Sequence, residues 1–369
     1  MPHPLDEYPV HQAPLSMQFP VTGDRGFYDR CYFNAHDRTG SIFLITGLGV
    51  YPNLGVIDAY ASVGRGTRMV SVHASDALGD DRLNQRVGPY RIEVIEPLQR
   101  VRLVCDGDSL GVGFDLTWEG SFPAQQEPQH VVRNGTKLML DGCRFTQVGT
   151  WSGELRVEGT RIEVSPERWV GARDRSWGIR PVGEPDPPGR WAAENTRGMW
   201  WLYVPLRFEE FGIIVIAQEE PDGTRVMNDA RRIWPASTGR APEQLGWPEV
   251  DITYRSGTRH PERAVIHLTD RNRKPIDLEI ETLGDMPLGP GTGYGGDEWA
   301  HGRWMGRGWT EGVVHDWSEP ALAARTPFML HDHIGRATLD GAEGWGLFEH
   351  ANIGRHEPSG FADFTSVAP

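Results

Sequence analysis

Glu349 is the residue of this sequence whose surroundings best suit proton transfer. Residues 344–350 read Gly-Trp-Gly-Leu-Phe-Glu-His, so this carboxyl follows an apolar, alternating run. A carboxylate is unfavourable in such a place unless it is paired or used, and apolar surroundings raise its pKa so that it stays protonated. We therefore expect Glu349 to donate a proton, with Tyr203 and His350 orienting it or taking the proton back.

A densely charged run precedes the midpoint of the chain. Residues 173–180 read Arg-Asp-Arg-Ser-Trp-Gly-Ile-Arg. The run fits either a ligand site or a network of ion pairs that joins two domains, and the residues alone leave both open. Three arginines around Asp174 would keep this candidate catalytic residue ionised, which makes it a poor proton donor. Arg175 and Trp177 are candidates for contacting a substrate.

Tryptophans supply the other candidate substrate-binding residues. Trp200 and Trp201 are adjacent, and adjacent residues of a strand face opposite sides, so only one of them is expected to line an interior. Tyr203 shares the face of Trp201. Trp345 lies in the C-terminal run described above. These indoles contact a bound molecule in one interpretation and only fill a core in the other.

His331 and His333 are two residues apart, which places both imidazoles on one face of a strand. Together with Glu349 they could form a metal site. Hydrogen-bonded histidines are the commoner reason for such a pair, so we predict no metal site.

The sequence lacks the motifs of several large enzyme classes. It contains no Gly-x-Ser-x-Gly, His-Glu-x-x-His or Walker loop, and no Gly-x-Gly-x-x-Gly that follows a strand. Hydrolase, zincin and nucleotide-binding interpretations therefore lose support, and we expect no cofactor. Cys31, Cys105 and Cys143 are widely separated and form no Cys-x-x-Cys pair, which indicates reduced thiols.

Charge and hydropathy restrict the partners. The chain has 51 acidic and 37 basic residues, a formal net charge of −14, and no basic run, so we expect no nucleic-acid partner. Apolar runs such as residues 211–217 fall far short of the roughly 20 residues that a membrane-spanning helix needs. Without a signal-peptide pattern, we expect a cytoplasmic protein with no stable membrane insertion. Its oligomeric state stays open.

Short β-rich runs separated by Gly, Asp and Asn turns recur along the chain. Consecutive hairpins of this kind, without crossover helices, favour meanders that close into barrels or sandwiches. The hairpins that we predict pair residues 56–62 with 68–73, 100–105 with 110–119, 155–157 with 161–164, 211–218 with 224–232, and 264–269 with 275–282.

A length of 369 residues suits two domains of roughly 150 to 200 residues each. We expect the densest proline segment, residues 181–190, to connect the two domains. This gives an N-terminal domain at 1–185 and a C-terminal domain at 186–369. We predict that both domains are antiparallel β-barrels and that helices are few and short. Residues 288–308, rich in Gly and Trp, are expected to form a lid or a binding loop.

Several short elements resemble the carotenoid 1,2-hydratase (hydroxyneurosporene synthase) superfamily and its AttH-like relatives. Residues 174–178, Asp-Arg-Ser-Trp-Gly, are similar to the family's Asp-His-x-Trp-Gly element, and an aromatic run with Tyr203 follows one strand later. Residues 147–153 and the closing run 344–350 also resemble family segments. Arg175 stands where the family has histidine, and Pro205 stands where we expect the hydratases to carry an acid. Both departures argue against carotenoid hydration itself.

The resemblance implies two lipocalin-like (calycin) barrels that hold a hydrophobic small molecule in their interiors and at their junction. It also implies acid-initiated chemistry on double bonds, because indole faces stabilise the carbocation that protonation of an alkene creates. We therefore expect a cofactor-independent lyase or isomerase, hydratase- or cyclase-like, acting on an isoprenoid, steroid-like or aromatic compound. The alternative is a non-catalytic carrier of the lipocalin type, because a fold alone does not choose between the two.

Overall fold

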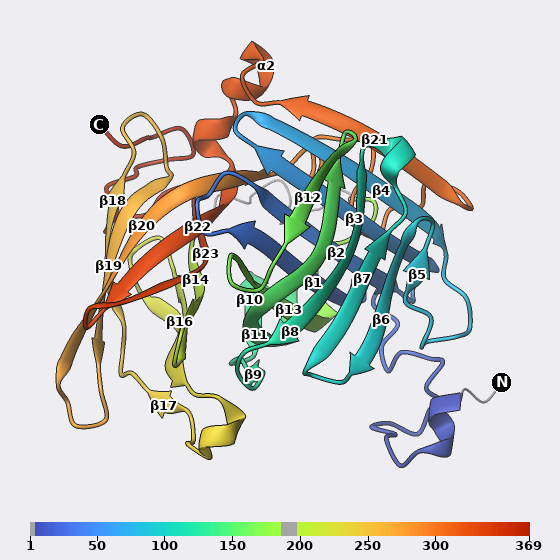
Figure 1. Ribbon diagram of the computed structural model, residues 1–369, viewed down its shortest axis with the longest axis horizontal. Coiled ribbons are helices and arrows are strands. Elements are labelled where there is room, and N and C mark those ends of the chain that lie inside the picture. Colours follow the sequence, from blue (N-terminus) through green and yellow to red (C-terminus); the bar gives the residue numbers. More distant parts are fainter. Residues whose placement is uncertain (1–3, 186–197) are drawn as a thin grey trace.

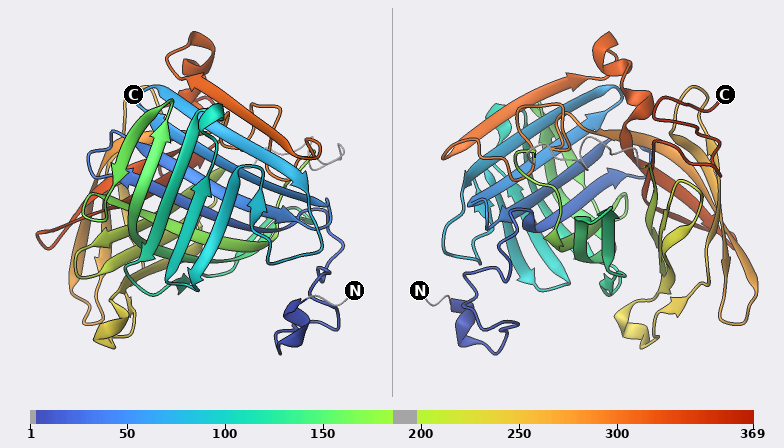
Figure 2. Two further views of the ribbon diagram at one scale, coloured as in Figure 1. Left: turned by 45° about the vertical axis from the view of Figure 1, so that its right-hand side comes forward. Right: turned by 180° about the vertical axis from the view of Figure 1, so that it is seen from behind.

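Two antiparallel β-sheets make up most of the protein. We describe a computed structural model in which residues 4–185 and 198–369 are placed. Each sheet curls on itself, and the two stand side by side (Figures 1 and 2). The predicted all-β architecture of two lipocalin-like halves with few short helices is confirmed. Among the described residues, no helix could cross a lipid bilayer.

The first sheet runs in the order β21-β4-β3-β2-β1-β13-β11-β8-β7-β6-β5, and β9, β10 and β12 pair with β11. Its strands are β1 (Phe27–Asp37), β2 (Phe43–Tyr51), β3 (Val56–Arg65), β4 (Arg68–Ala77), β5 (Arg86–Val87), β6 (Tyr90–Glu96), β7 (Arg100–Cys105), β8 (Val112–Gly120), β9 (Gln125–Gln126), β10 (His130–Asn134), β11 (Lys137–Val157), β12 (Thr160–Val164), β13 (Trp169–Ile179) and β21 (Trp309–Asp316).

The second sheet runs in the order β17-β16-β15-β14-β23-β22-β20-β19-β18. Its strands are β14 (Met199–Phe208), β15 (Gly212–Glu219), β16 (Arg225–Ile233), β17 (Glu243–Gln244), β18 (Glu249–Tyr254), β19 (Pro261–Thr269), β20 (Pro275–Leu288), β22 (Leu330–Leu339) and β23 (Ala342–Ile353). The helical turns are η1 (Pro4–Glu7), η2 (Asp108–Leu110), η3 (Ala236–Thr238), α2 (Pro320–Ala323) and η4 (Thr326–Phe328).

All five predicted hairpins are present, as β3–β4, β7–β8, β11–β12, β15–β16 and β19–β20. The β11–β12 turn shows why the local sequence was sufficient to predict these hairpins. Val157 pairs with Thr160 across a two-residue turn in which Glu158 and Gly159 have φ angles of 47° and 80°. Positive φ at both central positions is the geometry that matches the twist of a tight hairpin.

The described residues form four apolar clusters, and three of them bear on the site. One lies within the curl of the first sheet, where strands β3 and β4 contact β8 across the interior and Trp118 and Trp151 are fully buried. A second cluster lies within the second sheet. A third joins the two sheets and includes Tyr32, Trp201 and Tyr203. Side chains therefore occupy both curls, and the junction is where the sheets meet.

The expected domain boundary between residues 185 and 186 lies at the edge of residues 186–197, outside the described residues. One strand from the C-terminal side of that boundary, β21, pairs with β4 and extends the first sheet (Figure 1). The two parts of the sequence are therefore interleaved at this edge, since β20 and β22, which flank β21 along the chain, belong to the second sheet.

Residues 289–308, between β20 and β21, contain no strand, as predicted. Hydrogen bonds tie this segment to the first sheet: Ser62 Oγ donates to the carbonyl of Gly291 at 2.6 Å, and the amide of Gly302 donates to Asp58 Oδ2 at 2.7 Å. Trp299, which belongs to this segment, is fully buried. The segment is therefore a fixed wall of the junction.

Candidate functional site

A cavity of about 380 Å³ lies at the junction of the two sheets. Strands β1, β10, β11 and β13 form one wall, and β14, β15, β20, β22, β23 and the segment after β20 form the other. Its lining residues are Tyr28, Arg30, Tyr32, His130, Val132, Met139, Leu140, Gly142, Cys143, Arg144, Asp174, Ser176, Arg180, Pro181, Met199, Trp201, Gln218, Leu288, Tyr294, Leu330, Asp332 and Glu349. The expectation of a junction cavity agrees with this geometry, whereas the curls of both sheets are filled by side chains.

The second sheet places three polar side chains in a row across the cavity. Glu349 on β23 pairs with Asp332 on β22 on one side and with Tyr203 on β14 on the other. Side chains of directly paired residues stand on the same face with Cβ atoms about 5 Å apart. Asp332, Glu349 and Tyr203 are therefore immediate neighbours, although they lie up to 146 positions apart in the chain.

The first sheet presents a matching row. Asp174 on β13 pairs with Tyr32 on β1 and with Thr146 on β11. Alternation along β13 sends Asp174 to the junction, while its neighbours Arg173 and Arg175 point into the curl of the first sheet.

Hydrogen bonds join the outer members of the two rows. Tyr32 Oη donates to Asp332 Oδ2 at 2.6 Å, and the hydroxyls of Thr146 and Tyr203 are in hydrogen-bond contact. The central members, Asp174 and Glu349, are close enough that the charge of each acts on the other. The junction thus brings three carboxyl groups and two phenols into one place.

Burial raises the pKa of all three carboxyls. The pKa of Asp174 rises from 3.8 to about 7, first because of burial, with the charge of Glu127 adding and that of Arg144 opposing. The pKa of Asp332 rises well above its ordinary value because of burial and the nearby charge of Glu349. The pKa of Glu349 also rises through burial, but Arg144 and the hydrogen bond from Trp201 Nε1, 2.8 Å long, hold it down.

The expectation that Asp174 stays ionised among three arginines is wrong. Arg173 lies in the first curl, with its guanidinium 6.0 Å from the ring centres of Phe33 and Trp118, and Arg175 pairs with Asp29 at 2.9 Å. These two cations lie behind the strand, so desolvation dominates and Asp174 holds a proton far more readily than a surface aspartate.

Arg144 on β11 is one of three arginines in the cavity wall, with Arg30 and Arg180. Its Nε bonds Glu127 Oε2 at 2.5 Å, and its guanidinium lies 4.4 Å from the ring centre of Tyr203 and 5.5 Å from that of Trp201. His130 Nε2 contacts the same Glu127 oxygen at 3.0 Å. This network fixes the guanidinium over the two aromatic rings.

Three polar atoms of lining residues have no hydrogen-bond partner among the described residues. They are Arg30 Nη1, Arg144 Nη2 and Asp332 Oδ1. Buried polar groups are normally satisfied, so these atoms indicate contacts with water or with a bound molecule. The cavity therefore offers two guanidinium donors and one carboxyl oxygen to a ligand.

The sequence profile of a family of unknown function, DUF8625, matches residues 3–362. The chain belongs to this family. No curated protein matches it.

Several solved structures have a fold similar to that of this DUF8625 protein. An AttH-type protein from Nitrosomonas europaea covers 93% of this chain and 98% of its own, at 13% identity and a TM-score of 0.52. CghA covers 89% and 88%, at 11% identity and a TM-score of 0.51. Kievitone hydratase from Nectria haematococca covers 88% of each chain, at 15% identity and a TM-score of 0.47. The resemblance to AttH-like proteins is thus confirmed at the level of fold.

Of the residues expected to contact a substrate, Trp201 lines the cavity and Trp200 does not. Trp200 lies on the opposite face of β14 and packs in the second curl, 5.3 Å from His350 between ring centres. The expectation that only one of the two faces an interior is wrong, because both faces of β14 are covered and both indoles are buried.

Three further predicted residues lie outside the cavity. Arg175 is in the first curl, and Trp177 is 37% exposed. Trp345 shares the face of Glu349 on β23 but packs against Arg38, whose guanidinium is 4.7 Å from its ring centre. None of the three is among the residues that line the junction.

His350 also lies away from the cavity. As the neighbour of Glu349 it faces the other side of β23, where its Nδ1 contacts the carbonyl of Trp201 at 2.8 Å and its Nε2 contacts Tyr254 Oη at 3.0 Å. Burial lowers its pKa to about 4. It has no direct path to the proton of Glu349. The set His331, His333 and Glu349 is likewise not assembled, since Glu349 pairs with Asp332, between the two histidines, on the opposite face of β22.

Sequence reasoning missed Asp332, Tyr32, Arg144 and Glu127. Asp332 lies in the run Leu-His-Asp-His-Ile, and an acidic residue in a strand that is expected to be buried could have identified it as a candidate. Nothing in the local sequence of Tyr32 marks it, because its partner is 300 residues away.

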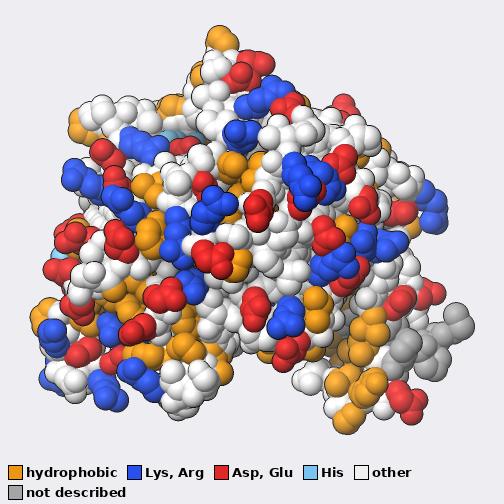
Figure 3. All heavy atoms as spheres, in the orientation of Figure 1, with side chains coloured by type: hydrophobic (Ala, Val, Ile, Leu, Met, Phe, Trp, Pro, Cys, Tyr) orange, Lys and Arg blue, Asp and Glu red, His pale blue; other side chains and the backbone are white. Residues whose placement is uncertain are grey.

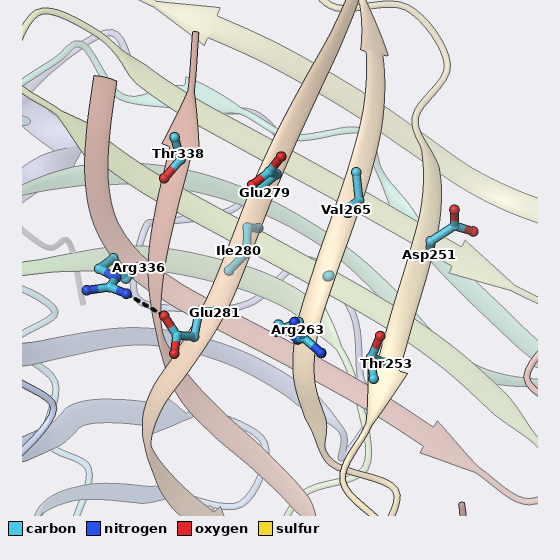
Figure 4. Close-up of a pocket in the computed structure, with 10 residues that line it drawn as sticks. Asp251, Thr253, Arg263, Val265, Glu279, Ile280, Glu281, Arg336 and Thr338 are labelled. Carbon is cyan, nitrogen blue, oxygen red and sulfur yellow. Dashed lines mark hydrogen bonds and ion pairs between the residues drawn. The ribbon is translucent and has the colours of Figure 1, made fainter. Parts of the chain in front are cut away.

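A separate hollow lies on the exposed face of β18, β19, β20 and β22 (Figure 4). It is lined by outward-pointing side chains such as Glu279 and Arg263, and Arg336 bonds Glu281 at 2.5 Å. These groups are solvated, and charges of both signs are interspersed over the face in Figure 3 in the same way. The junction cavity is therefore the stronger candidate for a functional site.

The raised pKa of Asp174 predicts a stability change with pH. Between about pH 4 and 7 the folded state binds a proton here that the unfolded state lacks, so its stabilising contribution is lost as pH rises through this window. We expect the urea midpoint to fall between pH 5 and 8, and Asp174→Asn to make this slope shallower. Glu119→Gln, on the exposed side of β8, is the control and should leave the slope unchanged. An identical slope in Asp174→Asn and wild type would contradict the assignment.

Proposed function

We propose that this protein is an acid–base lyase or isomerase, hydratase- or cyclase-like, that acts on a small apolar molecule in the junction cavity. The observation that carries the proposal is the buried pair Asp332 and Glu349, side by side in the wall of a cavity of about 380 Å³. Adjacent carboxyls in different environments divide into an acid and a base.

The surroundings assign the two roles. Among the described residues no cation acts on the Asp332 carboxyl, and Tyr32 holds one of its oxygens while Oδ1 is left without a partner. Glu349 receives the hydrogen bond of Trp201 and the field of Arg144. We therefore assign Asp332 as the proton donor and Glu349 as the proton acceptor, in place of the expectation that Glu349 donates.

The reaction begins when the O–H bond of Asp332 breaks and its proton forms a C–H bond with the π electrons of a substrate alkene. This step leaves an aspartate and a carbocation. Water then adds to the cation and gives a proton to Glu349, so that the net change is addition of one water. Transfer of that proton from Glu349 to its neighbour Asp332 restores the site. In a cyclisation a second alkene of the substrate replaces water as the nucleophile, and loss of a C–H proton to Glu349 completes it.

The aromatic wall suits such a cation. Tyr32 and Trp201 line the cavity, and electron-rich ring faces stabilise positive charge in a dry site by about 2 kcal/mol or more each. The Arg144 guanidinium lies 5.5 Å from the centre of the Trp201 ring, and its ion pair with Glu127 partly neutralises its charge.

The lining also restricts the substrate. Val132, Leu140, Leu288 and Leu330 supply apolar surface. The free donors on Arg30 and Arg144 suit one oxygen-bearing group, such as a carbonyl, carboxylate or phenol. The proposed substrate is thus an alkene or its hydrated form, with an apolar skeleton and a single polar end, as in isoprenoid, steroid-like or aromatic compounds.

The test starts from the molecule that copurifies with the chain. Asp332→Asn should retain substrate, whereas the wild type should retain product, and the two ligands should differ by one water or be isomers. Incubating the ligand of the variant with wild-type protein in ¹⁸O-labelled water should convert it, with one ¹⁸O atom incorporated in a hydration.

Glu281→Gln, on the exposed face of β20, is the matched control and should retain the same ligand as the wild type. If the wild type and Asp332→Asn retain the same ligand, and the wild type returns it unchanged, the protein is a carrier of the lipocalin type.

A further inference from the structure

Three histidines converge on the side of β22 that faces away from the cavity. His331 and His333 project from one face of this strand, and His260 precedes β19. One ring nitrogen from each residue lies within 4.8 Å of those of the others. The ring centres of His260 and His331 are 3.8 Å apart.

These imidazoles are buried, and two of them are unsatisfied. The exposed fractions of His260, His331 and His333 are 6%, 4% and 0%. Neither ring nitrogen of His331 or His333 has a hydrogen-bond partner among the described residues. The expectation of ordinary hydrogen-bonded histidines is not met at the Nε2 atoms of His331 and His333, and their Nδ1 atoms reach only Asp285. Buried polar atoms are normally satisfied, so the two Nε2 atoms, which have no partner of any kind among the described residues, indicate a missing ligand.

His260 is already oriented as a ligand. Its Nε2 lies 2.7 Å from the carbonyl oxygen of Thr326, which can only accept, so Nε2 carries the proton. The lone pair is then on Nδ1. A second nitrogen bound to a backbone carbonyl is the arrangement that fixes the tautomer of histidines in metal sites.

A carboxylate lies beside the cluster. Asp285 Oδ2 is 3.6 Å from His331 Nδ1 and 4.0 Å from His333 Nδ1. Arg255 Nη1 holds the same oxygen at 3.0 Å. Asp285 can serve as a fourth ligand or as the acceptor that orients two of the rings, and in both positions its charge favours a bound cation.

We propose that His260, His331 and His333 bind one divalent transition-metal ion of the zinc type. Imidazole nitrogen suits zinc, copper and nickel and is a poor ligand for magnesium or calcium. Zinc binds histidine nitrogen at about 2.0–2.1 Å, so the rings close slightly around the ion.

The ion would stabilise the fold and would not take part in catalysis. It would link the turn before β19 to β22, whose Asp332 lies between the two histidine ligands and on the opposite face. The backbone of β22 separates the two sites. The metal site therefore stands independently of the proposed function, and metal binding is measurable without any substrate.

The test is zinc binding by the intact protein. After treatment with a chelator and dialysis, zinc is added in competition with a chromophoric chelator. We expect one ion per chain, with a Kd in the micromolar range or below, and an increase in Tm. His333→Gln should weaken binding by at least about 100-fold. His267→Gln, an exposed histidine bound to Asp251 and Asp277, should bind zinc like the wild type.

Cobalt provides a measurement that needs no variant. Bound by three histidines, Co²⁺ should give the intense visible absorption of a four-coordinate ion with nitrogen ligands, and zinc should displace it. Failure of the wild type to bind zinc, equal affinity in His333→Gln, or a cobalt spectrum like that of the hydrated ion would each overturn the proposal.

Discussion

Asp332→Asn is expected to lower kcat by at least about 100-fold, the usual contribution of a general acid. The carboxyl is 1% exposed, and burial together with the nearby charge of Glu349 raises its pKa well above its ordinary value, which favours the neutral form. Asparagine has the same shape and is also neutral, but it cannot release a proton to carbon. The Tyr32 hydroxyl can still donate to the amide oxygen. Catalysis should therefore fall while the free energy of unfolding changes little.

Glu349→Gln tests the other half of the pair. It removes the proton acceptor, so turnover should also fall, and the double variant should lose little more than either single variant because the two groups act as a unit. Glu343→Gln, on the exposed part of the same strand β23, is the matched control and should leave kcat unchanged. Full activity of Asp332→Asn on the identified ligand would remove Asp332 from the mechanism.

The fold was largely predictable because its signals are local. The β11–β12 hairpin depends on a few consecutive residues, with alternation in the strands and Glu158-Gly159 in the turn. The interleaving of β21 was not predictable in this way. Its pairing with β4 joins residues about 240 positions apart, and its own sequence is compatible with either sheet.

The site was predictable only in part. Glu349 stood out because an acid after an apolar alternating run is unusual, and Asp174 stood out through its charged neighbours. The environment of Asp174 was misjudged, although the alternation rule applied to Trp200 and Trp201 also separates it from Arg173 and Arg175. Side-chain direction, and not proximity in sequence, decides which charges interact.

The roles within the site depend on one hairpin and on one contact between strands that are distant in the chain. Tyr32 reaches Asp332 because β1 and β22 face each other across the junction, and Glu349 adjoins Asp332 because β22 and β23 pair at that point. A slip of one residue in β22 would turn Asp332 away from the cavity and put His331 or His333 there instead. The register of β22 and β23 is set locally by the two-residue turn Asp340-Gly341, in which both φ angles are positive. No local pattern places β1 opposite β22, so the contact of Tyr32 with Asp332, on which the assignment of acid and base depends, could not be predicted from the sequence.

Trp118 stabilises the wall on which half of this site is built. Its indole on β8 is fully buried and lies 5.1 Å from that of Trp151, its direct partner on β11. Trp151 Nε1 donates to the backbone carbonyl of Asn34 at 2.8 Å, and the Asn34 amide in turn contacts Tyr32 Oη at 3.4 Å. Contacts therefore connect the packed interior of the first curl to the Tyr32 hydroxyl, which donates a hydrogen bond to Asp332.

Trp118→Ala is expected to lower the free energy of unfolding by about 3–5 kcal/mol, because the surrounding strands cannot close over the space of an indole. The indole Nε1 of Trp118 has no hydrogen-bond partner among the described residues, so the loss measures packing alone. Trp118→Phe should recover part of it, and Trp247→Ala, at a position 63% exposed, should change stability by less than about 0.5 kcal/mol. Urea unfolding followed by circular dichroism gives all three values. Equal losses of unfolding free energy for the buried and the exposed tryptophan would mean that the first curl is loosely packed. The first curl could then hold a small molecule, which would contradict the assignment of the binding cavity to the junction.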